Sequence, residues 1–235
     1  MSDKPTQLIT DDQQAAPALR LVILLLVSTV AAGLVYVLWS FPASAPGLTH
    51  TVATQMSQSG VSHPVTAVLL NFRGYDTLLE MVVLLMALLG VWALGGTADY
   101  HDQTPGPVLD TLARLLAPVL ILVAAYLLWV GAHAPGGAFQ AGSVLGAAGV
   151  LLLLAGWRPH VTLIALPLRL LLIIGPAAFV AMALVTLISE GRLLAYPVAQ
   201  AGTLILILET AATLSIGVTL AALFLGGELS DTQSK

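Results

Sequence analysis

Residues 204–225, LILILETAATLSIGVTLAALFL, form a stretch long and apolar enough to cross a lipid bilayer as one helix. The hydrocarbon core of a bilayer is about 30 Å thick, so a spanning helix needs roughly 20 apolar residues. Five further stretches qualify or nearly qualify, and they cover residues 19–39, 78–94, 112–130, 141–157 and 166–188. The sequence therefore predicts an all-α integral membrane protein with about six transmembrane helices.

The composition agrees with this fold class. Of the 235 residues, 58% are hydrophobic and 9% are charged, against roughly 25% charged residues in ordinary soluble domains. The mean hydropathy is +0.96. Little of the chain remains for a separate catalytic domain, so we expect no enzymatic activity.

Charge and cysteine content exclude some partners and cofactors. The net charge of −4 argues against nucleic acid as a partner. The chain has no cysteine, which excludes thiolate metal sites and cysteine-ligated iron–sulfur clusters of its own. The histidines His50, His63 and His133 lack the spacing of metal ligands. We therefore expect neither a metal nor a bound cofactor.

The basic residues predict the orientation of the spans. An even number of spans places both termini on one side of the membrane, and basic residues concentrate in short cytoplasmic flanks. Six basic residues fall on the side of the termini, and two fall on the other side. The six are Lys4, Arg20, Arg114, Arg158, Arg169 and Lys235, and the two are Arg73 and Arg192. This distribution predicts that the N- and C-termini are cytoplasmic.

A polar segment divides the chain once. Residues 95–97, GGT, end the second span, and a linker bearing Gly and Pro follows at residues 99–107. We expect a two-helix module over residues 1–98 and a four-helix module over residues 99–235. In the first module, residues 40–75 are too polar to span and predict an extracytoplasmic loop, with a short surface helix at 48–58.

Glycine and proline mark two further features of the predicted spans. Gly142, Gly146 and Gly149 put small residues on one face of the fourth span, which favours close contact with another helix. Gly175 and Pro176 should bend the fifth span near mid-membrane. That bend is typical either of a broken helix at an ion site or of an ordinary kink in a membrane helix.

Carboxylates inside the spans are the candidate functional residues. An ionisable side chain in hydrocarbon costs roughly 2.5–3.5 kcal/mol and usually persists because ions or protons need it. Glu80 and Glu209 lie inside spans with no lysine or arginine within a helical turn, while Asp76 lies one turn before Glu80 and Glu190 ends the fifth span. The predicted topology puts the glutamates in the outer half of the membrane. We expect these four residues to form an ion path.

Structural interpretations of the same residues stay open. Asp76 can simply begin a helix, and Glu190 can form a solvated pair with Arg192. Glu209 can serve as a hydrogen-bond partner between helices or subunits.

Two motifs resemble one protein family. Residues 66–80, TAVLLNFRGYDTLLE, resemble a signature near the C-terminal end of the A subunit of Mrp-type multisubunit Na⁺/H⁺ antiporters, and of the small E-type subunit of related membrane-bound hydrogenases. Residues 131–142, GAHAPGGAFQAG, resemble a loop of the B subunit of the same antiporters. Ala138 and Ala141 replace two glycines of that loop. The motif residues are Arg73, Gly74, Pro135, Gly136 and Gly137.

The resemblance implies a fusion of an E-type module with a B-type module. It implies an accessory, non-catalytic subunit in the plasma or inner membrane of a bacterium or archaeon, where other antiporter-like subunits, lipid and Na⁺ or H⁺ would be its partners. The complex could be an antiporter or a redox-driven complex with an Mrp-like module. The alternatives are a purely structural scaffold and a stand-alone secondary transporter. No repeat between the two three-helix halves is visible, and the only lysines, Lys4 and Lys235, lie outside the spans.

Overall fold

The structure, a computed structural model, describes residues 17–41, 47–94, 106–157 and 161–226. This part of the chain forms α-helices and one short π-helix, without strands. Helices long and apolar enough to span are α1 (Pro17–Ser40), α4 (Gly74–Leu94), α5 (Pro107–Val130), α7 (Val161–Glu190) and α8 (Ala201–Leu225), and α6 (Ala138–Leu154) is apolar but shorter. The predicted all-α membrane fold is confirmed. The predicted module boundary at 98/99 lies outside the described residues.

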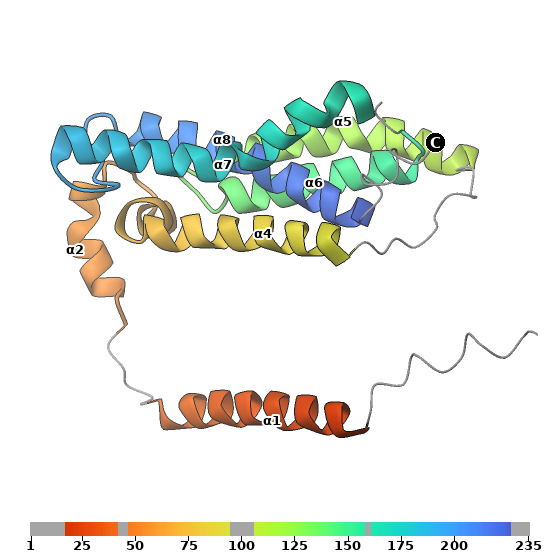
Figure 1. Ribbon diagram of the computed structural model, residues 1–235. Helices are drawn as coiled ribbons and strands as arrows, with labels where there is room; N and C mark the ends of the chain where they lie inside the picture. The colour runs from red at the N-terminus through yellow and green to blue at the C-terminus, as the bar shows by residue number, and fades with distance from the viewer. Residues whose placement is uncertain (1–16, 42–46, 95–105, 158–160, 227–235) are drawn as a thin grey trace, which may run out of the picture. The chain divides into compact units, whose positions relative to one another are not determined.

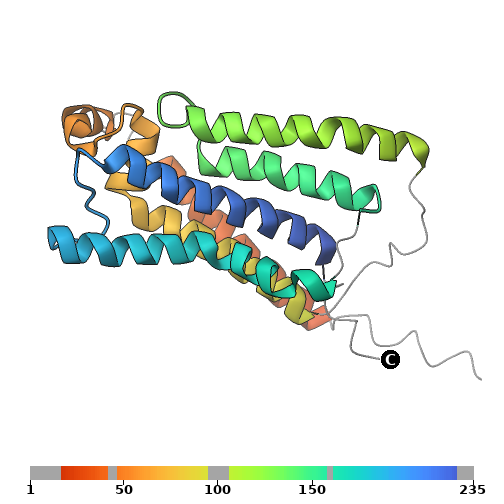
Figure 2. The ribbon, with the colours of Figure 1, turned by 90° about the horizontal axis from the view of Figure 1, so that it is seen from above.

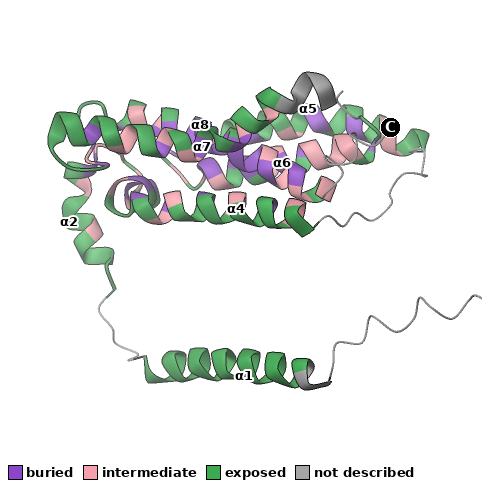
Figure 3. Ribbon diagram, viewed as in Figure 1, coloured by how far each residue is buried: buried purple, intermediate pink, exposed green. Residues whose placement is uncertain are grey.

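Helix α1 is part of a separate compact unit. The chain divides into a unit of residues 1–48 and a unit of residues 49–235. Every side chain described in α1 is exposed, as the uniform colour of that helix in Figure 3 shows. Its own unit therefore offers α1 no core, and its apolar surface suits a lipid or protein environment.

Helix α8 is the central helix of the second unit. It packs against α6 on one side and α7 on the other, while α5 packs against α6 (Figures 1 and 2). Helix α4 contacts both α8 and α7. Half of the apolar window of α8 is buried, against 17% of that of α4. A carboxylate on α8 is therefore placed in the interior of the unit.

Small residues let α6 and α8 approach closely. A Cβ atom added to Gly142 would lie 2.7 Å from Ile216 Cγ2, and one added to Gly146 would lie 3.0 Å from Leu220 Cβ. Gly149 faces Ala221 in the same way. The predicted glycine face is thus filled by a helix of the same chain, which leaves it closed to other subunits.

Helix α6 begins and ends earlier than the sequence predicts. Its last residue is Leu154, not Trp157, because Gly156 adopts a left-handed conformation with φ of 79°. The N–H of Gly156 bonds to the carbonyl of Leu153, and the N–H of Trp157 bonds to that of Leu152. This pair of hydrogen bonds is the Schellman arrangement that closes helices at glycine.

Helix α7 continues through Pro176. Proline has no N–H, so the carbonyl of Leu172, four residues earlier, lacks its usual partner within the helix. The hydroxyl of Ser215 on α8 donates to that carbonyl at 2.6 Å. Next to the proline, Gly175 lies so close to α4 that an added Cβ would be 2.0 Å from Met81 Cε. The α4, α7 and α8 helices thus meet at this point.

Residues 49–73 cover one end of the second unit, and we call them the end cap. They contain α2 (Thr49–Ser59), α3 (Pro64–Thr66) and the π-helix η1 (Ala67–Phe72). Helix α2 confirms the short helix predicted at 48–58. A Cβ added to Gly60 would lie 2.6 Å from Cβ of Ala201, so the end cap lies against the start of α8.

A buried loop completes this end of the unit. Leu194, in the segment between α7 and α8, has a positive φ of 55° and is 3% exposed. Its N–H donates to the hydroxyl of Thr186 at 2.7 Å, and its side chain lies against Gly74. Tyr196 in the same loop is also buried, and this burial raises the pKa of its hydroxyl well above the ordinary range. The tyrosine therefore stays neutral at physiological pH.

Candidate functional site

Glu209 is the buried carboxylate of the second unit. It is the ninth residue of α8 and is 4% exposed, which places it about 12 Å along the helix from its start. Oε1 lies against Gly137, where an added Cβ would be 2.7 Å from it. The backbone N–H of Ala138, the first residue of α6, also lies beside the carboxylate. Oε2 is buried and has no hydrogen-bond partner among the described residues.

The carboxylate therefore sits at the N-terminus of α6. Gly137 is the N-cap residue of α6, and because glycine has no side chain, it makes no capping hydrogen bond to the helix. The first N–H groups of a helix lack partners within the helix, and their dipoles favour a negative charge there. Glu209 supplies that charge from another helix, which partly offsets the cost of its burial.

The turn before α6 holds this geometry. Gly137 has φ of 103°, a conformation that favours glycine. Its N–H donates to the carbonyl of Leu127 at 2.9 Å. Gly136 lies so close to the same carbonyl that an added Cβ would be 2.5 Å away. The sequence predicts two glycines in turn conformations, and the structure assigns the positive φ to Gly137 and the close approach to Gly136.

The end cap is hydrogen-bonded to the same turn. The hydroxyl of Thr66 donates to the carbonyl of Gly131 at 2.6 Å. The hydroxyl of Ser62 donates to the carbonyl of Ala132 at 2.9 Å and lies 2.9 Å from Nδ1 of His133. The two motifs singled out in the sequence are therefore in direct contact.

The other predicted ion-path residues are not brought together with Glu209. Asp76, in the first turn of α4, pairs with Arg73. Glu80 is exposed on the surface of α4, and Glu190 is exposed at the last residue of α7. Among the described residues the ion pairs are Arg73–Asp76 and Arg114–Asp110, so neither glutamate is paired with a described cation.

The contact between Glu209 and the glycine turn is not foreseen by the sequence. Glu209 lies in the predicted span 204–225, whereas Gly137 lies in the turn between two other predicted spans, and nothing in their spacing relates them. The signals that single out each one separately are the cost of a carboxylate in a span and the paired glycines after Pro135. Within the described residues, no group of three His, Asp or Glu is arranged to hold a metal ion.

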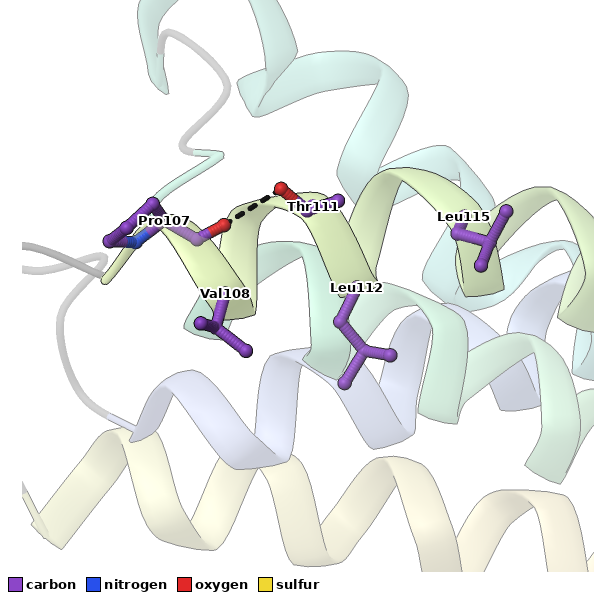
Figure 4. Close-up of a pocket in the computed structure, with 5 residues that line it drawn as sticks. All are labelled: Pro107, Val108, Thr111, Leu112 and Leu115. Carbon is purple, nitrogen blue, oxygen red and sulfur yellow. Dashed lines mark hydrogen bonds between the residues drawn. The ribbon is translucent and has the colours of Figure 1, made fainter.

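A hollow on α5 is a weaker candidate. It has a volume of about 480 Å³ and is lined by Pro107, Val108, Thr111, Leu112 and Leu115 (Figure 4). Its one hydroxyl, of Thr111, already donates to the carbonyl of Pro107 at 2.8 Å. The hollow thus offers no free polar side chain for an ion, and Glu209 is the better candidate.

The fold and the site together define a multi-pass α-helical membrane protein with a buried carboxylate at the start of an interior helix. The chain belongs to the family described as a domain related to the MnhB subunit of Na⁺/H⁺ antiporter, whose pattern matches residues 108–225. The B-type module predicted from residues 131–142 is confirmed. The E-type resemblance of residues 66–80 lies outside the matched residues and stays a prediction.

Two solved structures share this fold. One is a chain of the membrane-bound sulfane sulfur reductase, an archaeal respiratory membrane complex, with 24% identity and a TM-score of 0.67 over 89% of this chain and 97% of that chain. The other is a chain of the Mrp complex from Dietzia sp. DQ12-45-1b, with 23% identity and a TM-score of 0.64 over 95% of this chain and 27% of that chain. No curated protein matches the chain.

Proposed function

We propose that this chain is an accessory, non-catalytic membrane subunit of a multisubunit complex that moves cations and protons. The complex is an Mrp-type antiporter or a respiratory complex with an Mrp-like module, in the plasma membrane of a bacterium or archaeon. The family description names a Na⁺/H⁺ antiporter subunit, and the two related structures are of an Mrp complex and a respiratory membrane complex. These names support the proposal.

The observation that carries the proposal is the Glu209 carboxylate. It is buried in a membrane-spanning helix, where an ionisable side chain is costly and usually persists because ions or protons need it. One oxygen lies at the start of α6, and the other, Oε2, has no hydrogen-bond partner in the described part of the chain. A buried oxygen with a free lone pair can accept a proton or contact a cation. We assign to Glu209 the uptake and release of a proton or cation on the path through the complex.

The remaining carboxylates have graded roles in this proposal. Glu80 lies in the second turn of α4 and is exposed, so its charge costs less than that of Glu209. Asp76 is already paired with Arg73, and Glu190 ends its helix at the surface. We expect neutralisation to impair ion movement most at Glu209, less at Glu80, and least at Asp76 and Glu190.

A second function, as a structural scaffold, is favoured by one specific contact. The Glu209 carboxylate lies against Gly137 and Ala138 at the start of α6, and this contact joins α6 to α8 whether or not the carboxylate ever changes its charge. A scaffold needs only this contact, which a neutral side chain of the same shape can also make.

The substitution Glu209→Gln separates the two functions. Glutamine keeps the volume and the acceptor oxygen of glutamate but cannot ionise. We expect the complex to assemble normally, and cation-dependent proton movement to fall at least about tenfold, the effect of roughly 1.4 kcal/mol on a rate-limiting step. The measurement is made in inverted membrane vesicles from a strain whose own copy of the gene is replaced by the variant.

The control is Thr210→Val, on the next residue of the same helix. Thr210 is exposed, and its hydroxyl bonds only to the carbonyl of Leu206 in its own helix. This variant should transport normally. Unchanged transport by assembled Glu209→Gln complex from about pH 6 to about pH 9 would reject the ion-path role and favour the scaffold.

A further inference from the structure

The surface of α4 carries a carboxylate that the proposed function leaves without a neighbour. Glu80 is exposed in the second turn of this membrane-spanning helix. Most of α4 is exposed too, because only Thr77, Met81 and Leu88 along its length after Gly74 are buried against the rest of the unit. In Figure 3 the visible side of α4 is largely exposed.

The rest of the described chain supplies no cation to Glu80. The chain has lysine only at positions 4 and 235. Among arginines with described side chains, Arg73 pairs with Asp76 and Arg114 pairs with Asp110. Arg169 and Arg192 form no ion pair with Glu80, whose carboxylate also makes no hydrogen bond to a described residue. A compensating group would therefore have to come from outside the described residues.

Lipid is a poor neighbour for this carboxylate. Ionisable side chains in transmembrane segments almost always face protein or a water-filled cavity, and they pair with one another or with backbone carbonyls. A negative charge on a helix surface at this depth is best matched by a positive one on the facing helix.

The residues that follow Glu80 leave room for a facing helix. Val83, Ala87 and Gly90 are exposed and follow Glu80 at successive spacings of three, four and three residues, which places them on the same side of α4. Gly90 has no atom within 4 Å of the position that a Cβ would take. Small residues of this kind permit close approach between membrane helices.

We propose that the α4 face formed by Glu80, Val83, Ala87 and Gly90 docks a transmembrane helix of another subunit, and that this helix presents a lysine or arginine side chain to Glu80. The proposal rests on the proposed function, since it takes for granted that the chain is a subunit of a membrane complex. We infer a basic side chain on the partner helix, because no lysine or arginine among the described residues pairs with the Glu80 carboxylate.

Single cysteines test the docking face, because the chain has none of its own. Val83→Cys places a thiol beside Glu80. Val82→Cys is the matched control, since Val82 is exposed at the same depth but points away from Glu80 by the 100° rotation per residue of a helix. Both variants are labelled with a short thiol-anchored photo-cross-linker, which reacts with any side chain within reach, in membranes that contain the whole complex, and the adducts are identified by mass spectrometry.

We expect Val83→Cys to join a membrane helix of a second subunit near a basic residue, and Val82→Cys to join it at least about tenfold less, since the two thiols point about 100° apart around α4 and Val82 lies on the side away from Glu80. Adding Glu80→Lys should reduce the Val83 adduct at least about tenfold, because like charges across an interface repel. Changing the identified basic residue to glutamate should then restore the adduct. The amount of each variant in the membrane shows whether it folds.

Several results would overturn the docking proposal. They are an adduct between two copies of this chain, an adduct with α1 of the same chain, reaction of Val83→Cys with a lipid-dissolved maleimide alone, and an adduct that Glu80→Lys leaves unchanged in a well-folded variant. None of these results affects the test of Glu209→Gln, so loss of the docking face and loss of the ion-path function are distinguishable.

Discussion

Gly137 controls the position of the Glu209 carboxylate at the scale of single residues. The absence of a side chain at Gly137 leaves the space that Oε1 occupies, and because Gly137 is the N-cap residue of α6, this oxygen lies at the start of that helix. One residue thus provides both the space and the electrostatic partner. A carboxylate in this position is compensated by dipoles instead of a neighbouring cation, which leaves its second oxygen free.

Gly137→Ala should destabilise the protein more than an alanine at an open glycine with positive φ. Gly191 is the matched control, since its φ is 69° and an added Cβ would have no neighbour within 4 Å. Gly191→Ala should cost roughly 1–2 kcal/mol from its backbone conformation. Gly137→Ala should cost roughly 2–5 kcal/mol, because the methyl group also displaces Glu209. Thermal unfolding of the purified variants in detergent measures the difference, and equal shifts would show that the contact with Glu209 contributes nothing.

Contacts between helices determine the site at the scale of elements. The length of each apolar run predicts a helix, because backbone N–H and C=O groups in hydrocarbon must hydrogen-bond to one another within the segment. The sequence also singles out Glu209, because placing a carboxylate inside a membrane span costs free energy. Which helix receives its carboxylate is not predictable in this way, because that depends on how the Gly142 and Gly146 face of α6 fits onto α8. The Ser215 bond to α7 depends in the same way on how α7 packs against α8.

The Ser215 hydroxyl should matter only while Pro176 is present. Ser215→Ala leaves the carbonyl of Leu172 without a donor, which should cost roughly 0.6–1.7 kcal/mol in a membrane protein. In the Pro176→Ala background the new N–H can donate to that carbonyl, so Ser215→Ala should cost much less there. A double-mutant cycle of thermal unfolding measures this coupling.

The matched control for this cycle is Thr213→Ala, because the Thr213 hydroxyl is buried but bonds to the carbonyl of Glu209 in its own helix. Its effect should be the same with and without Pro176. An equal cost of Ser215→Ala in both backgrounds would mean that Ser215 does not compensate the proline.

At the scale of the whole second unit, the functional features gather at one end. There the end cap is hydrogen-bonded to the turn at residues 131–137 and lies against the start of α8. The loop at residues 191–200 is hydrogen-bonded to α7 and lies against Gly74 at the start of α4. Arg73 and Arg192 belong to this end, while Arg114 lies near the start of α5, where it stacks on Trp157 at 5.1 Å. The basic residues Lys4, Arg158 and Lys235 lie outside the described residues. Arg73 and Arg192 are the smaller group in the sequence count of six basic residues to two, so this end is expected to face away from the cytoplasm.

The orientation of the chain is the last prediction. Ser57, exposed on α2 in the end cap, should be extracytoplasmic, and Gly106, exposed at the start of α5, should be cytoplasmic. The 24 residues of α5 separate Gly106 from the turn at Gly131 by about 36 Å, enough to cross the hydrocarbon core. In the cysteine-free chain, a membrane-impermeant maleimide should label Ser57→Cys in intact cells and Gly106→Cys only after permeabilisation. The reverse pattern would place the Glu209 site near the cytoplasmic surface, and a proton taken up by Glu209 would then come from the cytoplasm.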